Sequence, residues 1–358
     1  MGIFGKLFNK EKEKKSEIST QEKSIIQKVN VYGSQNDLDP ILKRKLNCDL
    51  YPGEVYLIWW ADGRSAKYEL PRYFSYEFGI NTDNSLKRLL QKNLLSYASP
   101  YASLKNLKVQ ELKSILIEQG LNNKGIKSEL IQEIIKNIPE NIVGKYINEP
   151  VYAVTPEGND ILTEYSYIIY GHNQGTHDGC VNVVSMMKYH DKLPKYLKNE
   201  DITWRILNDA FNEHSIKRKY GMLRNVICSQ AEFLKKEKRF LDSLSDWILA
   251  LTLDLSGLGN APTVIDSGKE TYPYRGATCA DVMVIPYIFD EINEIIKNEN
   301  FEMGEYNLAY EHAWKIYSGF FDRGLLDKLM NYEVIKIGLS GSLSSIQKFY
   351  KDDIYIKQ

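Results

Sequence analysis

The chain has 358 residues, 43% of them hydrophobic and 26% charged, with a formal net charge of −1. This length predicts two or three domains, and the composition excludes a disordered chain. The sequence holds no apolar run of 18 residues, so we expect no transmembrane helix. Its cysteines are widely spaced and no export signal stands at the start, so we expect reduced thiols and a cytoplasmic location. The cysteines are Cys48, Cys180, Cys228 and Cys279.

Positive charge is concentrated in the middle of the first half of the chain. Between Lys87 and Lys145 there are ten Lys and Arg residues against five Asp and Glu, whereas the rest of the chain carries 36 against 42. A local excess of this kind indicates a surface that attracts an anionic partner.

The first 35 residues read as a charged flexible tail, and residues 36–103 as a small α/β region. We expect a short helix at 38–46, a strand over 53–61 that ends at Asp62–Gly63, and an extended stretch over 67–74. The segment 82–95 predicts a helix that Asp83 or Asn84 caps, because its leucines recur at helical spacing.

Residues 104–138 predict a helix–loop–helix. Leu107, Leu112, Ile115 and Leu116 fall on one face of a first helix, which Gly120 ends as a C-cap glycine. The loop LNNKG places Gly125 where a positive φ is needed, and a second helix restarts with apolar Leu130, Ile131, Ile134 and Ile135. Each helix is only about three turns long, so the pair buries little by itself.

The remainder divides into three parts. Residues 139–199 read as a connecting α/β region, in which 149–162 is an extended piece, a turn and a helix start, and 164–174 is a strand or a buried helix. Residues 200–335 are periodic at helical spacing throughout, and 336–358 form a polar tail. The predicted fold class is therefore α+β and mostly α, with β structure confined to the N-terminal part and an all-helical C-terminal domain.

The spacing within 104–138 closely resembles a SAP motif, the helix–loop–helix nucleic-acid-binding module of scaffold-attachment and DNA-repair proteins. The residues that carry this resemblance are Leu104, Leu107, Val109, Leu112, Lys113, Leu116, Gly120, Leu121, Gly125, Lys127, Leu130 and Ile134. The chain departs from the pattern at Glu133 and Lys136, which surround a place where many family members have Arg. The resemblance implies DNA as the partner, with RNA as the alternative.

Lysines stand where the two helices are expected to begin. Lys108 precedes the first helix, while Lys124, Lys127 and Ser128 surround the start of the second. A lysine at a helix N-terminus is unfavourable unless an anion compensates it, so we interpret these residues as phosphate contacts. The full candidate set is Lys108, Lys113, Lys124, Gly125, Lys127 and Ser128. Binding through such contacts is expected to be salt-sensitive and largely independent of sequence.

Three weaker resemblances surround the motif. The segments 85–99 and 152–162 are similar to half of a winged helix that an insertion splits, or to a plain helix and hairpin. Residues 224–255 resemble one tetratricopeptide-like helical hairpin, with Ala231, Phe240, Ser243, Trp247 and Ala250 at the crossing positions. The order as a whole, including PRYFSYEFGI, resembles SAP-domain proteins of unassigned role from Gram-positive bacteria and their prophages.

The alternatives come from other functional classes. The helical C-terminal domain is expected to bind an unidentified protein. In one alternative, the SAP-like unit is structural within an assembly scaffold that binds no nucleic acid. In another, the chain is a nuclease or processing enzyme that uses the loop of residues 171–180. GHNQGTHDGC gathers His172, His177, Asp178 and Cys180, but its spacing is irregular for a zinc site, and a polar loop explains it better. We find no catalytic motif, and we expect no metal and no cofactor.

Overall fold

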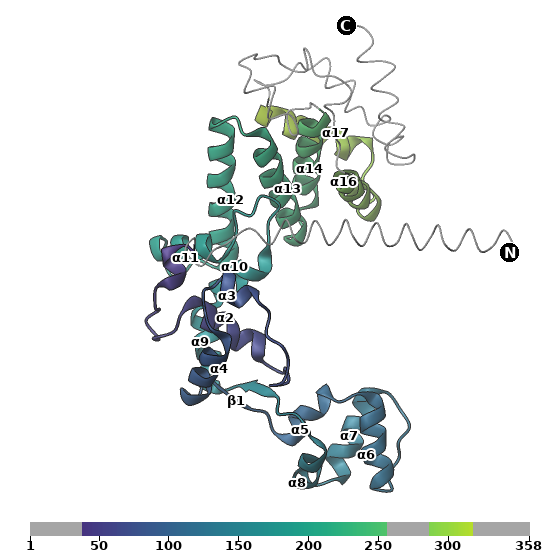
Figure 1. Ribbon diagram of the computed structural model, residues 1–358. Helices are drawn as coiled ribbons and strands as arrows, with labels where there is room; N and C mark the ends of the chain where they lie inside the picture. Colours follow the sequence, from purple (N-terminus) through teal and green to yellow (C-terminus); the bar gives the residue numbers. More distant parts are fainter. Residues whose placement is uncertain (1–37, 256–285, 318–358) are drawn as a thin grey trace, which may run out of the picture. The chain divides into compact units, whose positions relative to one another are not determined.

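The computed structural model describes residues 38–255 and 286–317 (Figure 1). Helix predominates, and the one sheet among these residues has two short strands, which confirms the mostly α part of the predicted fold class. None of the described helices is long and apolar enough to cross a membrane. The chain divides into two compact units, 1–169 and 170–358. The predicted tails, 1–35 and 336–358, lie outside the described residues.

The described part of the first unit, from residue 38, opens with short helical elements. They are η2 (Pro40–Lys43), α2 (Pro52–Ala61), α3 (Tyr73–Tyr76) and α4 (Thr82–Gln91). The predicted strand over 53–61 is wrong, since this segment is α2. Pro52 is the first helical residue, and the Tyr51 N–H donates to the Glu54 carboxylate at 2.9 Å, which fixes the N-terminus. The helix is buried on nearly every side, so its apolar residues show no helical period to distinguish it from a strand.

Two smaller predictions in this region also need correction. The expected extended stretch over 67–74 runs into the helical turn α3. Helix α4 forms as predicted, but its cap is Asn81 and neither Asp83 nor Asn84: Asn81 Oδ1 accepts from the Asn84 N–H at 3.0 Å. Leu86 and Leu89 carry the buried face of α4, while Leu94 lies beyond its end.

A two-stranded antiparallel sheet lies in the middle of the unit. Strand β1 (Leu95–Tyr97) pairs with β2 (Tyr152–Val154), with Leu95 opposite Val154, so residues 98–151 are inserted between the two strands. Thr155 then caps α9 (Pro156–Glu164), accepting from the Gly158 N–H at 3.0 Å, which confirms the predicted strand, turn and helix. The expected half of a winged helix stays a prediction.

The insertion folds as a lobe, a name we use for residues 100–147. Its elements are α5 (Pro100–Ser103), η3 (Leu104–Asn106), α6 (Val109–Glu118), α7 (Lys127–Asn137), α8 (Glu140–Val143) and η4 (Gly144–Tyr146). The predicted helix–loop–helix is α6 and α7. Its apolar core extends past residue 138 to Val143, with Tyr101 and Ile147 packed against it. The short helices around the pair therefore supply the burial that two three-turn helices lack.

The second unit is an array of helices. Helix α10 (Ser166–Gln174) precedes these helices. The segment 164–174, for which the hydrophobic period allowed a strand or a helix, is therefore mostly helical. The helices that follow are α11 (Val183–Lys192), α12 (Asn199–Ile216), α13 (Tyr220–Lys236), α14 (Phe240–Leu255), α16 (Pro286–Asn298) and α17 (Met303–Tyr317). Helices α13 and α14 form the predicted hairpin: the Ser243 hydroxyl donates to the Ala231 carbonyl at 2.8 Å, and both residues are fully buried. Small residues at the crossing allow this close approach.

Candidate nucleic-acid interface

Both helices of the predicted motif begin at the same end of the lobe. Lys127 is the first residue of α7, and its Nζ donates to the carbonyl of Lys105 at 2.6 Å. Lys105 lies in η3, the turn that leads into α6 at Val109. The start of α7 therefore lies beside the segment that starts α6, and the two N-termini face the same region.

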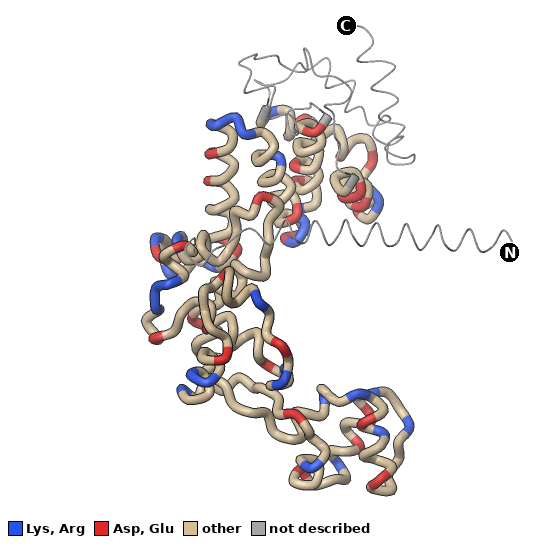
Figure 2. Tube along the Cα trace, viewed as in Figure 1, with Lys and Arg blue, Asp and Glu red and all other residues tan. Residues whose placement is uncertain are grey.

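Four lysines mark this end of the lobe, and we call Lys105, Lys108, Lys124 and Lys127 the lysine end. Lys108 is the N-cap residue of α6 and is exposed, as are Lys105 and Lys124, whereas Lys127 is half-buried. In the view of Figure 2, lysine positions lie along the upper edge of the lobe. Among the described residues, none of these four amines forms an ion pair with a carboxylate. Their charges are thus available to an anionic partner.

The other predicted site residues are placed less centrally. Ser128, the second residue of α7, is exposed, and its hydroxyl has no hydrogen-bond partner among the described residues. Lys113 is half-buried and lies one turn further along α6 than the N-terminus. The structure therefore brings Lys108, Lys124, Lys127 and Ser128 to one end, with Lys113 on the adjoining turn.

A carboxylate already accepts one backbone N–H at each helix N-terminus. The Lys108 N–H donates to Glu111 Oε2 at 2.5 Å, and the Ile126 N–H donates to Glu129 Oε2 at 2.9 Å. Each glutamate is the third residue of its helix and caps that helix from within. Glu111 and Glu129 therefore already place a negative charge at each helix start, and the interpretation of the lysines as phosphate contacts stays a prediction.

Gly125 serves the same cap. Its φ is +127°, a conformation that side-chain-bearing residues avoid, and a Cβ atom there would lie 2.4 Å from Glu129 Oε2. The positive φ is thus the main reason for glycine here, and a side chain would also displace the capping carboxylate. The predicted positive φ of Gly125 is confirmed. The group that lies close to this glycine is the Glu129 carboxylate.

Asn122 has a geometric role in the loop, since its Oδ1 accepts from the Lys124 N–H at 3.2 Å. Gly120 has a φ of +68°, and the Leu121 N–H donates to the Leu116 carbonyl at 2.8 Å, which closes α6 as predicted.

Sequence reasoning missed three participants. Lys105 precedes the periodic segment, so nothing in the sequence connects it to α7. Glu111 and Glu129 could have been found, because a glutamate three residues after each N-cap position is the spacing of a helix cap.

The histidine-containing loop forms a polar network in the second unit. His177 Nε2 lies 3.0 Å from Glu232 Oε1, and this partner raises the pKa of His177. Burial lowers the pKa of His172. Within residues 38–255 and 286–317, no three His, Cys, Asp or Glu side chains lie close enough together to hold a metal ion. Cys48, Cys180 and Cys228 are free thiols, and Cys279 lies outside the described residues.

A scan against protein-family models finds no match to this chain, and a search of curated proteins finds no similar sequence.

Proposed function

We propose that the lobe is a SAP-type helix–loop–helix that binds nucleic acid, most favourably DNA, and that the helical second unit is a protein-interaction domain. The observation that carries the proposal is the lysine end: four lysines without carboxylate partners at the place where α6 and α7 both begin. Clustered cations of this kind attract phosphates, and they position a backbone without reading its bases.

The capping glutamates bear on which groups of the lobe would contact phosphate. Each glutamate takes one backbone N–H, that of Lys108 or that of Ile126, and places a negative charge at the helix start. We therefore assign the main phosphate contacts to the lysine side chains. Four phosphate contacts on duplex DNA correspond to a slope of log K against log salt of about −3.6. We therefore expect weak, strongly salt-dependent binding with little preference for sequence.

Fluorescence anisotropy of a labelled duplex, a single strand and an RNA hairpin, each at low and near-physiological salt, tests the proposal. The variant that decides it is Lys108→Glu with Lys124→Glu, since both side chains are exposed and neither amine holds another part of the lobe. Lys127 is a poorer choice because its amine holds the Lys105 carbonyl. We expect the double variant to lose binding to the favoured ligand.

A matched control lies on the same lobe. Lys136, in the last turn of α7, and Lys145, in η4, are exposed and lie away from the helix N-termini. Lys136→Glu with Lys145→Glu introduces the same charge change and should retain most of the binding. Equal losses from the two pairs would show a general charge effect and would contradict the site.

One observation favours the scaffold alternative. The lobe exposes apolar side chains at both of its helix starts, with Val109 40% and Ile126 67% exposed, and it also exposes Ile117. Exposed aliphatic groups of this size are typical of protein contacts. If none of the three nucleic acids binds at low salt, the lobe is a protein-binding element, and Ile126→Ser becomes the variant with which to look for its partner.

A further inference from the structure

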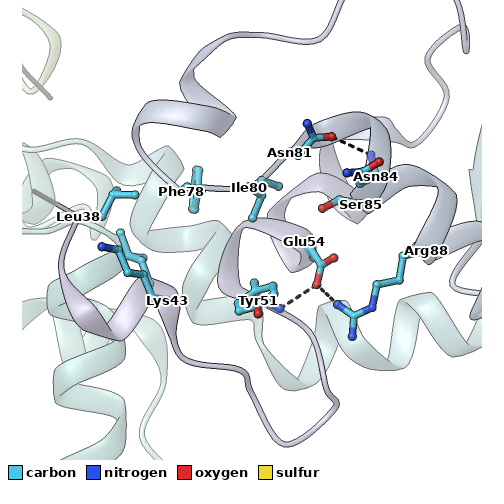
Figure 3. Close-up of a pocket in the computed structure, with 12 residues that line it drawn as sticks. Leu38, Lys43, Tyr51, Glu54, Phe78, Ile80, Asn81, Asn84, Ser85 and Arg88 are labelled. Carbon is cyan, nitrogen blue, oxygen red and sulfur yellow. Dashed lines mark hydrogen bonds and ion pairs between the residues drawn. The ribbon is translucent and has the colours of Figure 1, made fainter. Parts of the chain in front are cut away.

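The first unit contains a cavity that the proposed function does not use. It has a volume of about 490 Å³ and lies between η2, the start of α2, residues 78–81 and α4 (Figure 3). Cavities of 300–1,000 Å³ are the usual size of small-molecule sites. The cavity is distinct from the lobe, since every residue that lines it lies between Leu38 and Arg88.

A fixed carboxylate lies in the wall of this cavity. Glu54 is 2% exposed, and its Oε2 accepts from the Tyr51 N–H at 2.9 Å and from Arg88 Nη1 at 2.7 Å. Figure 3 shows both contacts reaching the same oxygen. The other carboxylate oxygen has no hydrogen-bond partner among the described residues, so it is an acceptor without a donor.

A second polar group accompanies it on α4. Ser85 precedes Arg88 by three residues, so both lie on the face of α4 that meets Glu54. Ser85 is 6% exposed, and its hydroxyl has no partner in the described part of the chain. The hydroxyl of Ser85 and the second carboxylate oxygen of Glu54 belong to residues that line one cavity, and neither atom has a partner among the described residues. Both are therefore available to hydrogen-bond to a ligand in the cavity.

The opposite wall is apolar. Leu42, Phe78 and Ile80 line it and are each less than 10% exposed. Phe78 stacks on Tyr56 at 5.4 Å between ring centroids, which holds the ring in place. A rigid aromatic and aliphatic wall favours a flat or apolar ligand body. The rim is polar, since Asn81, Asn84 and Lys43 also line the cavity and are exposed.

The charges in the wall do not favour a cationic ligand. Arg88 compensates Glu54 and also binds Asp49, with Nη2 2.6 Å from Asp49 Oδ2. Lys45 and Lys92 contact the same aspartate, and together with Arg88 they hold its pKa far below the usual range. Because Glu54 already has its counter-ion, a cationic ligand would gain little there.

We propose that this cavity binds a nucleoside. The N–H edge of the base donates to the second oxygen of Glu54 and meets the Ser85 hydroxyl, while the ring packs against Phe78 and Ile80. The sugar hydroxyls meet Asn81, Asn84 and Lys43 at the rim. A nucleoside has N–H groups that match Glu54 and Ser85. Its planar base matches the apolar wall, and its sugar hydroxyls match the polar rim. The inference does not rest on the proposed function of the lobe.

Isothermal titration calorimetry of the full chain with adenosine, guanosine, cytidine and uridine, and with ribose alone, tests the inference. We expect at least one nucleoside to bind with one-to-one stoichiometry and ribose not to bind. Ser85→Ala should weaken binding by about fivefold, the loss of one neutral hydrogen bond. Glu54→Gln should weaken nucleoside binding further. If Glu54→Gln fails to fold, Ser85→Ala still tests the inference.

The control is Lys87→Ala, an exposed lysine on α4 that does not line the cavity and should leave the affinity unchanged. The inference is overturned if no nucleoside binds, or if Ser85→Ala binds as tightly as the parent chain. Lys108→Glu with Lys124→Glu should not alter nucleoside binding, and Ser85→Ala should not alter DNA anisotropy, so the two proposals fail independently.

Discussion

At the scale of single residues, the lobe depends on two glutamates and one glycine. Glu111 and Glu129 satisfy N–H groups at the two helix starts, and Gly125 leaves room for the second of them. A lysine-rich helix start is tolerated here because an internal carboxylate balances it. Within the lysine end, the Lys127 amine has a structural contact, since it donates to the Lys105 carbonyl. The amines of Lys105, Lys108 and Lys124 have no such contact with the described residues.

Gly125→Ala should destabilise the lobe by about 2 kcal/mol, because it adds backbone strain and displaces the Glu129 cap. Gly120→Ala is the matched control, since its φ is +68° and no atom lies within 4 Å of the added Cβ. The control should cost about 1 kcal/mol. Hydrogen exchange of the α7 amides measures both, and equal losses of protection would contradict the role given to Glu129.

A second residue-scale prediction concerns pH. Burial, together with nearby Asp242, raises the pKa of Asp246 to about 7. The folded state then binds a proton that the unfolded state releases near pH 3.8, so stability is lost as pH rises from about 4 to 7. Asp246→Asn should stabilise the protein by about 1–2 kcal/mol at about pH 8 and have little effect at about pH 4. Thermal unfolding at the two pH values measures this, and a gain at about pH 4 alone would contradict it.

At the scale of elements, α2 shows how burial overrides local pattern. Its apolar residues face other elements on nearly every side, and the one charged side chain within it, Glu54, is held by Arg88 of α4. The ion pair therefore fixes α2 against α4, and it is partly shielded from water because the Glu54 side chain is 3% exposed.

Arg88→Ala should destabilise the first unit by about 3 kcal/mol, because it leaves the Glu54 carboxylate buried without its partner. Lys92→Ala is the control: Lys92 contacts exposed Asp49 at 3.1 Å, and such a surface pair contributes less than about 1 kcal/mol. Urea unfolding followed by tryptophan fluorescence compares them, since Trp59 and Trp60 lie in α2. Similar midpoints for the two variants would show that the Glu54–Arg88 pair does not hold α2.

At a larger scale, the lobe and the second unit each have a hydrophobic core of their own. The lobe buries Leu116, Leu130 and Ile134, while the second unit buries Trp247, Ile248 and Tyr306. No residue belongs to both clusters, so a cavity in one core removes no packing from the other.

Ile248→Ala should cost about 2–5 kcal/mol in the second unit and leave the lobe unchanged. Hydrogen exchange should show lost protection in α13, α14 and α17 but the same protection in α6 and α7. Leu116→Ala should give the reverse pattern. Loss of protection in both units from either variant would show that they unfold together.

The sequence by itself determined the elements whose signals are local. The leucine spacing of α4, the α6–loop–α7 pattern with Gly120 and Gly125, and the Thr155 cap of α9 were all predictable, because a helical period or a turn residue specifies each. Tertiary structure alone decided that 52–61 is a helix, that Lys105 joins the lysine end and that Glu54, Ser85 and Phe78 line one cavity. These depend on which distant segments pack together, and a segment that is apolar on every side carries no period from which that packing could be read.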